Sequence, residues 1–317
     1  MKILLSFTFF IFLIAANTCV FAQVNPTLTD SEGYVVVNGG EIWYRIIGEG
    51  NEDPLLMMHG GPGGTSRSFY LFEKLTKDRP IILFDQLGTG RSGHHEDTTL
   101  MLVDEFVEQV AALTNHLKLN DFYLYGHSWG TALALEYYSA YPAGVKGIIF
   151  NSPYFSTAIW EADADTLIKA LHPVVQQAIA NGEASGDFTS ASYQQANTVY
   201  AANYGSRRKR RSSDLDTARA PGNYFMYNYM WGPTEFTATG TLKTYDIMDK
   251  LKKVNVPTLF ITGEFDEARP STVRYFQTLV PNSQTVVVKK AGHATMHDNL
   301  RQNKKAIRKF LKELEEI

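Results

Sequence analysis

A serine stands between two glycines at a spacing that suits nucleophilic catalysis. The stretch YGHSWG sets Ser128 between His127 and Trp129. Gly126 and Gly130 stand just outside them, after an apolar run and before a helical pattern. A strand-to-helix turn of this kind excludes a Cβ atom at its outer positions and holds the serine hydroxyl clear of the sheet. The stretch therefore predicts Ser128 as a nucleophile, with an ordinary tight turn as the alternative.

A serine hydroxyl needs a base within hydrogen-bond reach, and the base needs an acid that orients it. After a turn of this type, the chain order is serine, acid, histidine. Among the eight histidines, His293 and His297 are the ones that follow a plausible acid downstream of Ser128. His293 comes directly after a predicted strand and the turn Ala291-Gly292, whereas His297 begins a helical stretch. We therefore predict His293 as the base.

The stretch TLFITGEFDEARP supplies the candidate acids after another predicted strand. Glu264, Asp266 and Glu267 all follow that strand, and ligand-facing groups gather at the carboxyl ends of parallel strands. Asp266 lies where a loop can turn it toward His293, so we favour it, although spacing alone leaves the other two acids open.

A glycine-rich stretch, MHGGPGG, follows a short strand and suits the stabilisation of an oxyanion. Such a loop can aim a backbone N–H into a site with no Cβ in the way. Gly61 is the best candidate donor, paired with the N–H of Trp129. A tight turn without a catalytic role is the alternative for this stretch.

The remaining histidines do not predict a metal site. His94 and His95 have no third ligand at a helpful spacing, and His293 with His297 lacks the glutamate of a zinc-binding helix. We therefore expect neither a metal nor an organic cofactor.

Strand and helix patterns alternate along most of the chain, which predicts an α/β fold with a mostly parallel sheet and helices on both faces. Between residues 153 and 240 the alternation stops, and a helical, loop-like insertion over the sheet is expected. The predicted elements are a hairpin at 35–47, strands at 54–58, 81–85, 122–125, 145–150, 258–262 and 285–288, an amphipathic stretch at 66–76, and helices at 102–117, 131–138, 272–279 and 303–314.

The first residues are typical of a secretory signal. Lys2 precedes an apolar run at 3–16, and VFA, ending at Ala22, has small side chains where a signal peptidase cuts. The run is short for a membrane span, which needs about 20 residues, so an uncleaved anchor is the weaker alternative. We predict a secreted or periplasmic protein without a stable membrane anchor. Cys19, the only cysteine, lies in this segment, so the mature chain would form no disulfide.

Bulk composition is that of an ordinary soluble globular protein. Of the 317 residues, 44% are hydrophobic and 20% are charged, and the net charge of −3 gives no sign of nucleic-acid binding. One local exception is the run RRKRR at 207–211. We interpret it as a solvated loop, with an anion site or a processing site as alternatives.

Several stretches together resemble the prolyl aminopeptidases (proline iminopeptidases) of the α/β-hydrolase superfamily. They are HGGPG at 59–63, DQLGTGRS at 85–92, GHSWG at 126–130, GEFDEARP at 263–270 and GH at 292–293. The stretch MWGPTEFTATGTLKTYDI at 230–247 is similar to the branch typified by tricorn-interacting aminopeptidases. The resemblance covers nearly everything from about residue 30 onward and is weakest at 155–222.

This resemblance implies an α/β-hydrolase fold with a helical cap. With the signal peptide predicted at 1–22, the expected boundaries are core at 23–153, cap at 154–240 and core again at 241–317. It also implies removal of an N-terminal residue, often proline, from short peptides or amino-acid amides with a free N-terminus. The family's triad falls on Ser128, Asp266 and His293, and its oxyanion donors fall on Gly61 and Trp129.

By motif match, the family's amine-binding carboxylates fall on Glu235 and Glu267. A carboxylate pair in a water-poor site suits an exopeptidase, which must recognise a cationic terminus. A helix-capping role for Glu235 and a solvated Glu267 are the alternatives. We further expect an apolar wall for the first substrate residue or, equally, a cap core, from Tyr224, Phe225, Tyr227 and Trp231.

Two other functions stay open at this stage. An amidase or esterase acting on small amino-acid derivatives would use the same triad. A binding module without catalysis would not need Ser128, and the intact set of serine, aspartate and histidine argues against it.

Overall fold

The computed structural model describes residues 25–77, 79–208 and 221–316. The predicted signal segment at 1–22, with Cys19, lies outside the described residues, as do residues 209–211 of the basic run.

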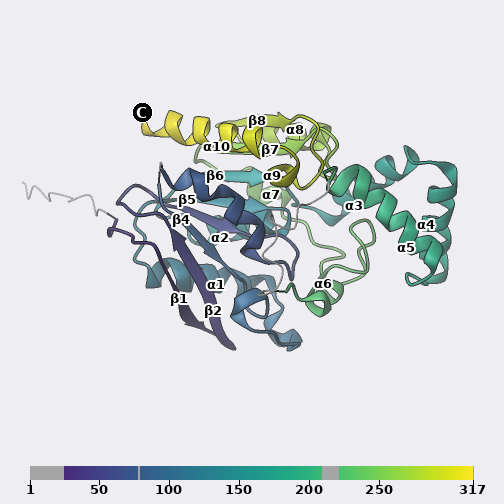
Figure 1. The fold of residues 1–317 in the computed structure, drawn as a ribbon, viewed down its shortest axis with the longest axis horizontal. Coiled ribbons are helices and arrows are strands. Elements are labelled where there is room, and N and C mark those ends of the chain that lie inside the picture. The colour runs from purple at the N-terminus through teal and green to yellow at the C-terminus, as the bar shows by residue number, and fades with distance from the viewer. Residues whose placement is uncertain (1–24, 78, 209–220, 317) are drawn as a thin grey trace, which may run out of the picture.

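An eight-stranded sheet forms the centre of the molecule, in the order β1-β2-β4-β3-β5-β6-β7-β8 (Figure 1). The first two strands form the predicted antiparallel hairpin, β2 pairs antiparallel with β4, and the remaining pairs are parallel. The strands are β1 (Ser31–Val37), β2 (Gly40–Ile47), β3 (Leu55–Met58), β4 (Ile81–Phe84), β5 (Phe122–His127), β6 (Val145–Asn151), β7 (Thr258–Gly263) and β8 (Ser283–Val288).

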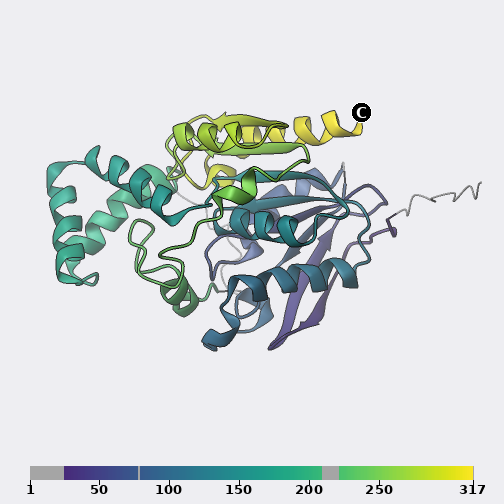
Figure 2. The ribbon, with the colours of Figure 1, turned by 180° about the vertical axis from the view of Figure 1, so that it is seen from behind.

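Successive side chains of a strand point to opposite faces of the sheet. The central strands β3, β4 and β7 are buried throughout, so both faces of the sheet are covered there. In β3, Leu56 belongs to one hydrophobic core and Met57 to the other. Helices cover both faces, as Figures 1 and 2 show from opposite sides. The first core is completed by α1 (Val103–His116), α2 (Trp129–Ala140) and α8 (Pro270–Thr278), and the second by η1 (Ser66–Lys77), α9 (Thr295–Asp298) and α10 (Leu300–Glu315).

A helical insertion connects β6 to β7, within the stretch where the sequence pattern predicts one. Helices α3 (Thr157–Lys169), α4 (Pro173–Ser185) and α5 (Ala191–Tyr200) project beyond one end of the sheet (Figures 1 and 2). They enclose a small core of their own that includes Tyr193, Tyr200 and Phe236. We call this insertion the cap; its elements are α3 (Thr157–Lys169), α4 (Pro173–Ser185), α5 (Ala191–Tyr200), the π-helical turn η4 (Ala201–Gly205) and α6 (Tyr224–Met230), and α7 (Met248–Leu251) leads back to β7.

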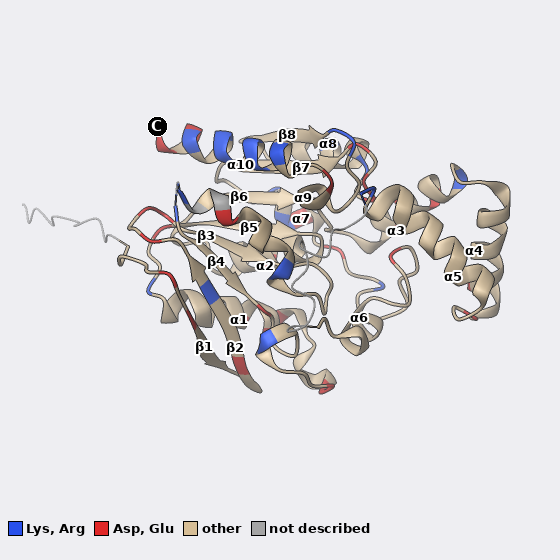
Figure 3. Ribbon diagram, in the orientation of Figure 1, with Lys and Arg blue, Asp and Glu red and all other residues tan. Residues whose placement is uncertain are grey.

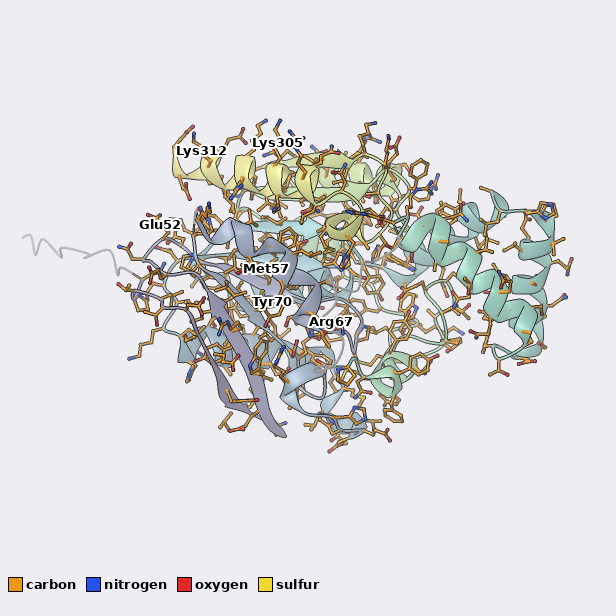
Figure 4. The ribbon with its side chains drawn as sticks, in the orientation of Figure 1. Glu52, Met57, Arg67, Tyr70, Lys305 and Lys312 are labelled. Atoms are coloured by element: carbon orange, nitrogen blue, oxygen red, sulfur yellow. The ribbon has the colours of Figure 1, made fainter. Side chains whose placement is uncertain are left out.

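Positive charge gathers on α10, which Figure 3 shows as a row of basic bands. Its exposed face includes Lys305 and Lys312, both labelled in Figure 4, while Ile307 and Phe310 pack into the core beneath. None of the helices within the described ranges is long and apolar enough to cross a membrane.

Candidate active site

The predicted site residues lie on loops that leave the same edge of the sheet, at the carboxyl ends of parallel strands. Gly61 follows β3, Ser128 follows β5, Asp266 follows β7 and His293 follows β8. Because neighbouring parallel strands end side by side, residues separated by more than a hundred positions meet there.

Ser128 occupies a strained turn. Its φ of 55° and ψ of −127° lie in a region that residues with a Cβ atom rarely adopt. A Cβ on Gly126 would come within 2.2 Å of the carbonyl oxygen of Gly130, and a Cβ on Gly130 within 2.1 Å of the Met58 carbonyl oxygen. Glycine is therefore required on both sides, and the serine is held at the N-terminus of α2.

Asp266 is the acid that reaches the histidine. His293 Nδ1 lies 2.9 Å from Asp266 Oδ1. The second carboxylate oxygen accepts from the Gly263 N–H at 2.9 Å and lies 2.7 Å from the Ser152 hydroxyl. Of the other candidates, Glu264 instead accepts from the backbone N–H of an exposed lysine, Lys290.

The buried pair of Asp266 and His293 has shifted pKa values. Burial alone would raise the pKa of Asp266, but His293 and the hydrogen bonds to its oxygens hold it below its usual value. Burial alone would lower the pKa of His293, yet Asp266, Glu267 and Glu235 together raise it to about 9. The imidazole therefore holds its proton to a higher pH than an ordinary histidine, unless a positive charge offsets the surrounding carboxylates.

Ser128 and His293 line one cavity of about 300 Å³, to which Glu235 also contributes. We call it the polar cavity. Within the described ranges the Ser128 hydroxyl has no hydrogen-bond partner, and catalytic hydrogen bonds of this kind often close only when substrate is bound. The backbone of His293 is fixed by several contacts, because its N–H donates to the Tyr204 carbonyl at 2.7 Å and its carbonyl accepts from His127 Nε2 at 3.1 Å and from the Ser152 hydroxyl at 2.9 Å.

A second cavity also reaches Ser128 and is lined by Gly61, Trp129 and three further aromatic side chains. We call it the aromatic pocket, after Tyr154, Trp160 and Trp231. These rings meet edge to face, with centroids 5.4 to 6.3 Å apart. Both indole N–H groups donate to backbone carbonyls, at 2.7 and 2.8 Å, which orients these two rings.

Two glutamates and two phenols form a polar cluster beside these cavities. Glu235 lines both cavities. Burial and the neighbouring Glu235 raise the pKa of Glu267 to about 8, and burial also raises that of Glu235. Glu267 Oε2 and the hydroxyls of Tyr200 and Tyr227 are buried without a well-aligned hydrogen bond to any described residue, although the Tyr227 hydroxyl lies close enough to Glu235 to shift its pKa. Buried acceptors left in this way suit a cation that donates several hydrogen bonds.

Comparison with known proteins places the chain in a family. The model of the α/β-hydrolase fold matches residues 53–300. The chain is 39% identical over 267 residues to the proline iminopeptidase of Heyndrickxia coagulans, a match covering 83% of this chain and 92% of that one. It is 34% identical over 274 residues to the proline iminopeptidase of Lactiplantibacillus plantarum, covering 82% and 93% respectively. The chain belongs to the proline iminopeptidase family of α/β-hydrolases.

Solved structures agree with this assignment. The crystal structure of VinJ superposes with a TM-score of 0.83 at 28% identity and covers 90% of this chain and 99% of that one. The proline iminopeptidase of Mycobacterium smegmatis superposes with a TM-score of 0.81 at 26% identity, covering 90% and 98%. This member of the proline iminopeptidase family is thus a hydrolase whose overall fold matches those of solved structures.

The predicted substrate wall needs correction. Trp231 lines the aromatic pocket, but Tyr224 and Phe225 are 69% and 38% exposed. The reason is the orientation of α6, which buries Met226 and Met230 in the core and therefore directs Tyr224 and Phe225 toward solvent. Tyr227 lies near Glu235 rather than in the pocket wall.

Gln86 is a positioning residue that sequence reasoning missed. Its side-chain oxygen accepts from the Trp129 indole at 3.1 Å, and its amide nitrogen donates to the His59 carbonyl at 3.2 Å. Its backbone N–H also donates to His59 Nε2 at 3.0 Å. Gln86 thereby ties the glycine-rich loop to the turn that carries Ser128. In the sequence, Gln86 is marked only by its place in the stretch DQLGTGRS, which supports the family resemblance but does not indicate a role for this residue.

Asp298 is a second missed residue, and it joins the cap to the histidine loop. Its carboxylate accepts from the Gly292 N–H at 2.8 Å, next to His293. It also accepts from the backbone N–H groups of Arg207 and Arg208, at 3.0 and 2.9 Å. These two arginines are exposed, as predicted for the basic run, yet their backbone is held.

No group of three or more His, Cys, Asp or Glu side chains within the described ranges could hold a metal ion.

Proposed function

We propose that this chain is a serine aminopeptidase that releases an N-terminal proline, or another small apolar residue, from short peptides. The observation that carries the proposal is the position of Glu235, which lines both the polar cavity with Ser128 and His293 and the aromatic pocket. The printed names of the relatives, proline iminopeptidases, support the same activity.

The reaction begins when the Ser128 oxygen attacks the first peptide carbonyl. His293 takes the hydroxyl proton and passes it to the departing nitrogen, while Asp266 orients the ring and stabilises its charged form. The backbone N–H groups of Gly61 and Trp129 stabilise the oxyanion, and loss of one such donor costs about 3 kcal/mol. Water then hydrolyses the acyl-enzyme, with His293 again acting as the base.

Glu235 and Glu267 hold the substrate ammonium. A prolyl ammonium carries two N–H groups, which match two carboxylates, and Glu267 Oε2 is buried without a hydrogen-bond partner among the described residues. Its positive charge also offsets the carboxylates that raise the pKa of His293. Binding of a free amine therefore favours the neutral imidazole that the attack requires.

The aromatic pocket selects the first residue. Three rings and Leu242 line about 10 Å³ of free space beside Ser128, so these walls have to move apart for a compact apolar ring such as that of proline to enter. We further propose that the chain is exported, with its leader removed after Ala22. The intact mass of the exported protein, which shows where its N-terminus lies, tests this proposal. A mass that includes the leader would contradict it.

The test of the activity compares kcat/KM on prolyl, alanyl and leucyl anilides, amides and esters, each with a free or an acetylated N-terminus. We expect acetylation to abolish most activity and prolyl substrates to be preferred. Glu235→Gln should lower kcat/KM on free-amine substrates by the equivalent of about 1–3 kcal/mol, because a charge-assisted contact to the ammonium is lost. Equal cleavage of acetylated and free substrates would contradict the ammonium site, and preference for esters or amides over anilides and peptides would indicate an amidase or esterase.

A further inference from the structure

We propose that Arg67 binds the free carboxylate of the leaving residue, so that the enzyme is built to cleave dipeptides. The inference rests on the proposed aminopeptidase function and concerns the polar cavity. The two cavities share Gly61, Ser128 and Glu235, so a substrate that lies across Ser128 occupies both. The first residue takes the aromatic pocket, which leaves the polar cavity for the residue that departs.

Arg67 is the one lysine or arginine among the described residues that line the polar cavity. It is half-buried, and its guanidinium has no ion pair or hydrogen bond to any described residue. Thr65 and Ser68 line the same cavity and add hydroxyl donors. Figure 4 labels Arg67 near the middle of the view, in the region where the core meets the cap. A guanidinium presents a planar pair of N–H donors that fits a carboxylate with two parallel hydrogen bonds.

The charges of the site match a zwitterion. Glu235, with Glu267 beside it, holds the ammonium, and Arg67, on the lining of the same polar cavity as Glu235 and Ser128, holds the carboxylate. A cavity of about 300 Å³ is at the small end of ligand sites, which suits one leaving residue better than a long chain.

Arg67 takes no part in bond making. When the peptide C–N bond breaks, the acyl group stays on Ser128 and the nitrogen takes the proton from His293. The free amino acid then departs with its carboxylate from Arg67. A longer peptide or a C-terminal amide has no carboxylate at this position and gains nothing from the guanidinium.

The experiment measures kcat/KM on prolyl-alanine, prolyl-alanine amide and prolyl anilide for wild type, Arg67→Gln, Arg67→Lys and Arg274→Gln. Arg274 is an exposed arginine on α8, away from the residues that line either cavity, and serves as the matched control. We expect Arg67→Gln to lose roughly 10–100-fold on the dipeptide, as for a hydrogen-bonded charge, with little change on the other two substrates. Arg67→Lys should keep part of the dipeptide preference, and the control should match wild type.

An equal loss on all three substrates would overturn the proposal and assign Arg67 to the support of its loop. Unchanged dipeptide cleavage would overturn it as well. Should Arg67→Gln fail to fold, wild type and Arg67→Lys still decide, because the proposal requires wild type to prefer the dipeptide over its amide. If the wild-type enzyme cleaves prolyl anilide but shows no preference for the dipeptide, the carboxylate subsite alone is contradicted. If the wild-type enzyme is inactive on every prolyl substrate, the proposed function is contradicted.

Discussion

The carboxylates around His293 determine where this base titrates. An ordinary histidine has a pKa near 6.5, and here, against the effect of burial, Asp266, Glu267 and Glu235 raise it to about 9. Because the base must be neutral to accept the serine proton, kcat/KM should fall on the acid side at a pH above 6.5. Glu267→Gln removes a negative charge, so the pKa of His293 should fall and the acid limb should move to lower pH.

The pH profile of kcat/KM for prolyl anilide measures this shift, with the same substrate for each variant. Glu264→Gln is the matched control, because Glu264 is exposed and instead accepts from the Lys290 backbone. An acid limb that stays in place in Glu267→Gln, or that moves equally in the control, would contradict the role of Glu267.

At the scale of elements, the site is held together by contacts between the cap and the histidine loop. The carbonyls of Tyr204 and Gly205, at the end of the π-helical turn, accept from the N–H groups of His293 and Ala294 at 2.7 and 2.8 Å. Asp298 adds hydrogen bonds to both segments. The guanidinium of Arg207 also stacks on Phe265, the neighbour of Asp266 in the chain, at 4.0 Å.

Asp298→Ala should therefore weaken both stability and catalysis. Loss of several hydrogen bonds to one charged, half-buried acceptor should lower the free energy of unfolding by about 1–3 kcal/mol. It should also lower kcat more than it raises KM, because the histidine loop loses its support. Urea unfolding and steady-state kinetics measure the two effects, and Asp298→Asn, which keeps one oxygen acceptor, should recover part of each. A variant with wild-type kcat would show that the cap contact does not position His293.

The alternation of strand and helix patterns in the sequence predicted the strands and helices of the core well, because each buried parallel strand is a short apolar run. Strand β5 and the serine turn were expected at their observed positions, and so was the loop carrying His293. The segment 66–77 is a 3₁₀ helix, which an amphipathic pattern alone does not distinguish from an α-helix.

At the scale of the whole molecule, the parts that could be predicted are those that the sheet brings together. The order of serine, acid and histidine along the chain, combined with the common edge of parallel strands, predicted that Ser128, Asp266 and His293 would converge. The walls of the aromatic pocket could not be found in this way. Tyr154 and Trp160 enter the site through the packing of the cap on the core, which leaves no periodic pattern in the sequence.

The central claim is that His293 activates Ser128 as a nucleophile. The most direct measurement is the mass of the intact protein, and of its peptides, after reaction with a fluorophosphonate that modifies activated serines. We expect one adduct per chain, on the peptide that contains Ser128, and none in Ser128→Ala or His293→Ala. No adduct on the folded wild-type protein, or an adduct on another residue with Ser128 unmodified, would contradict the account.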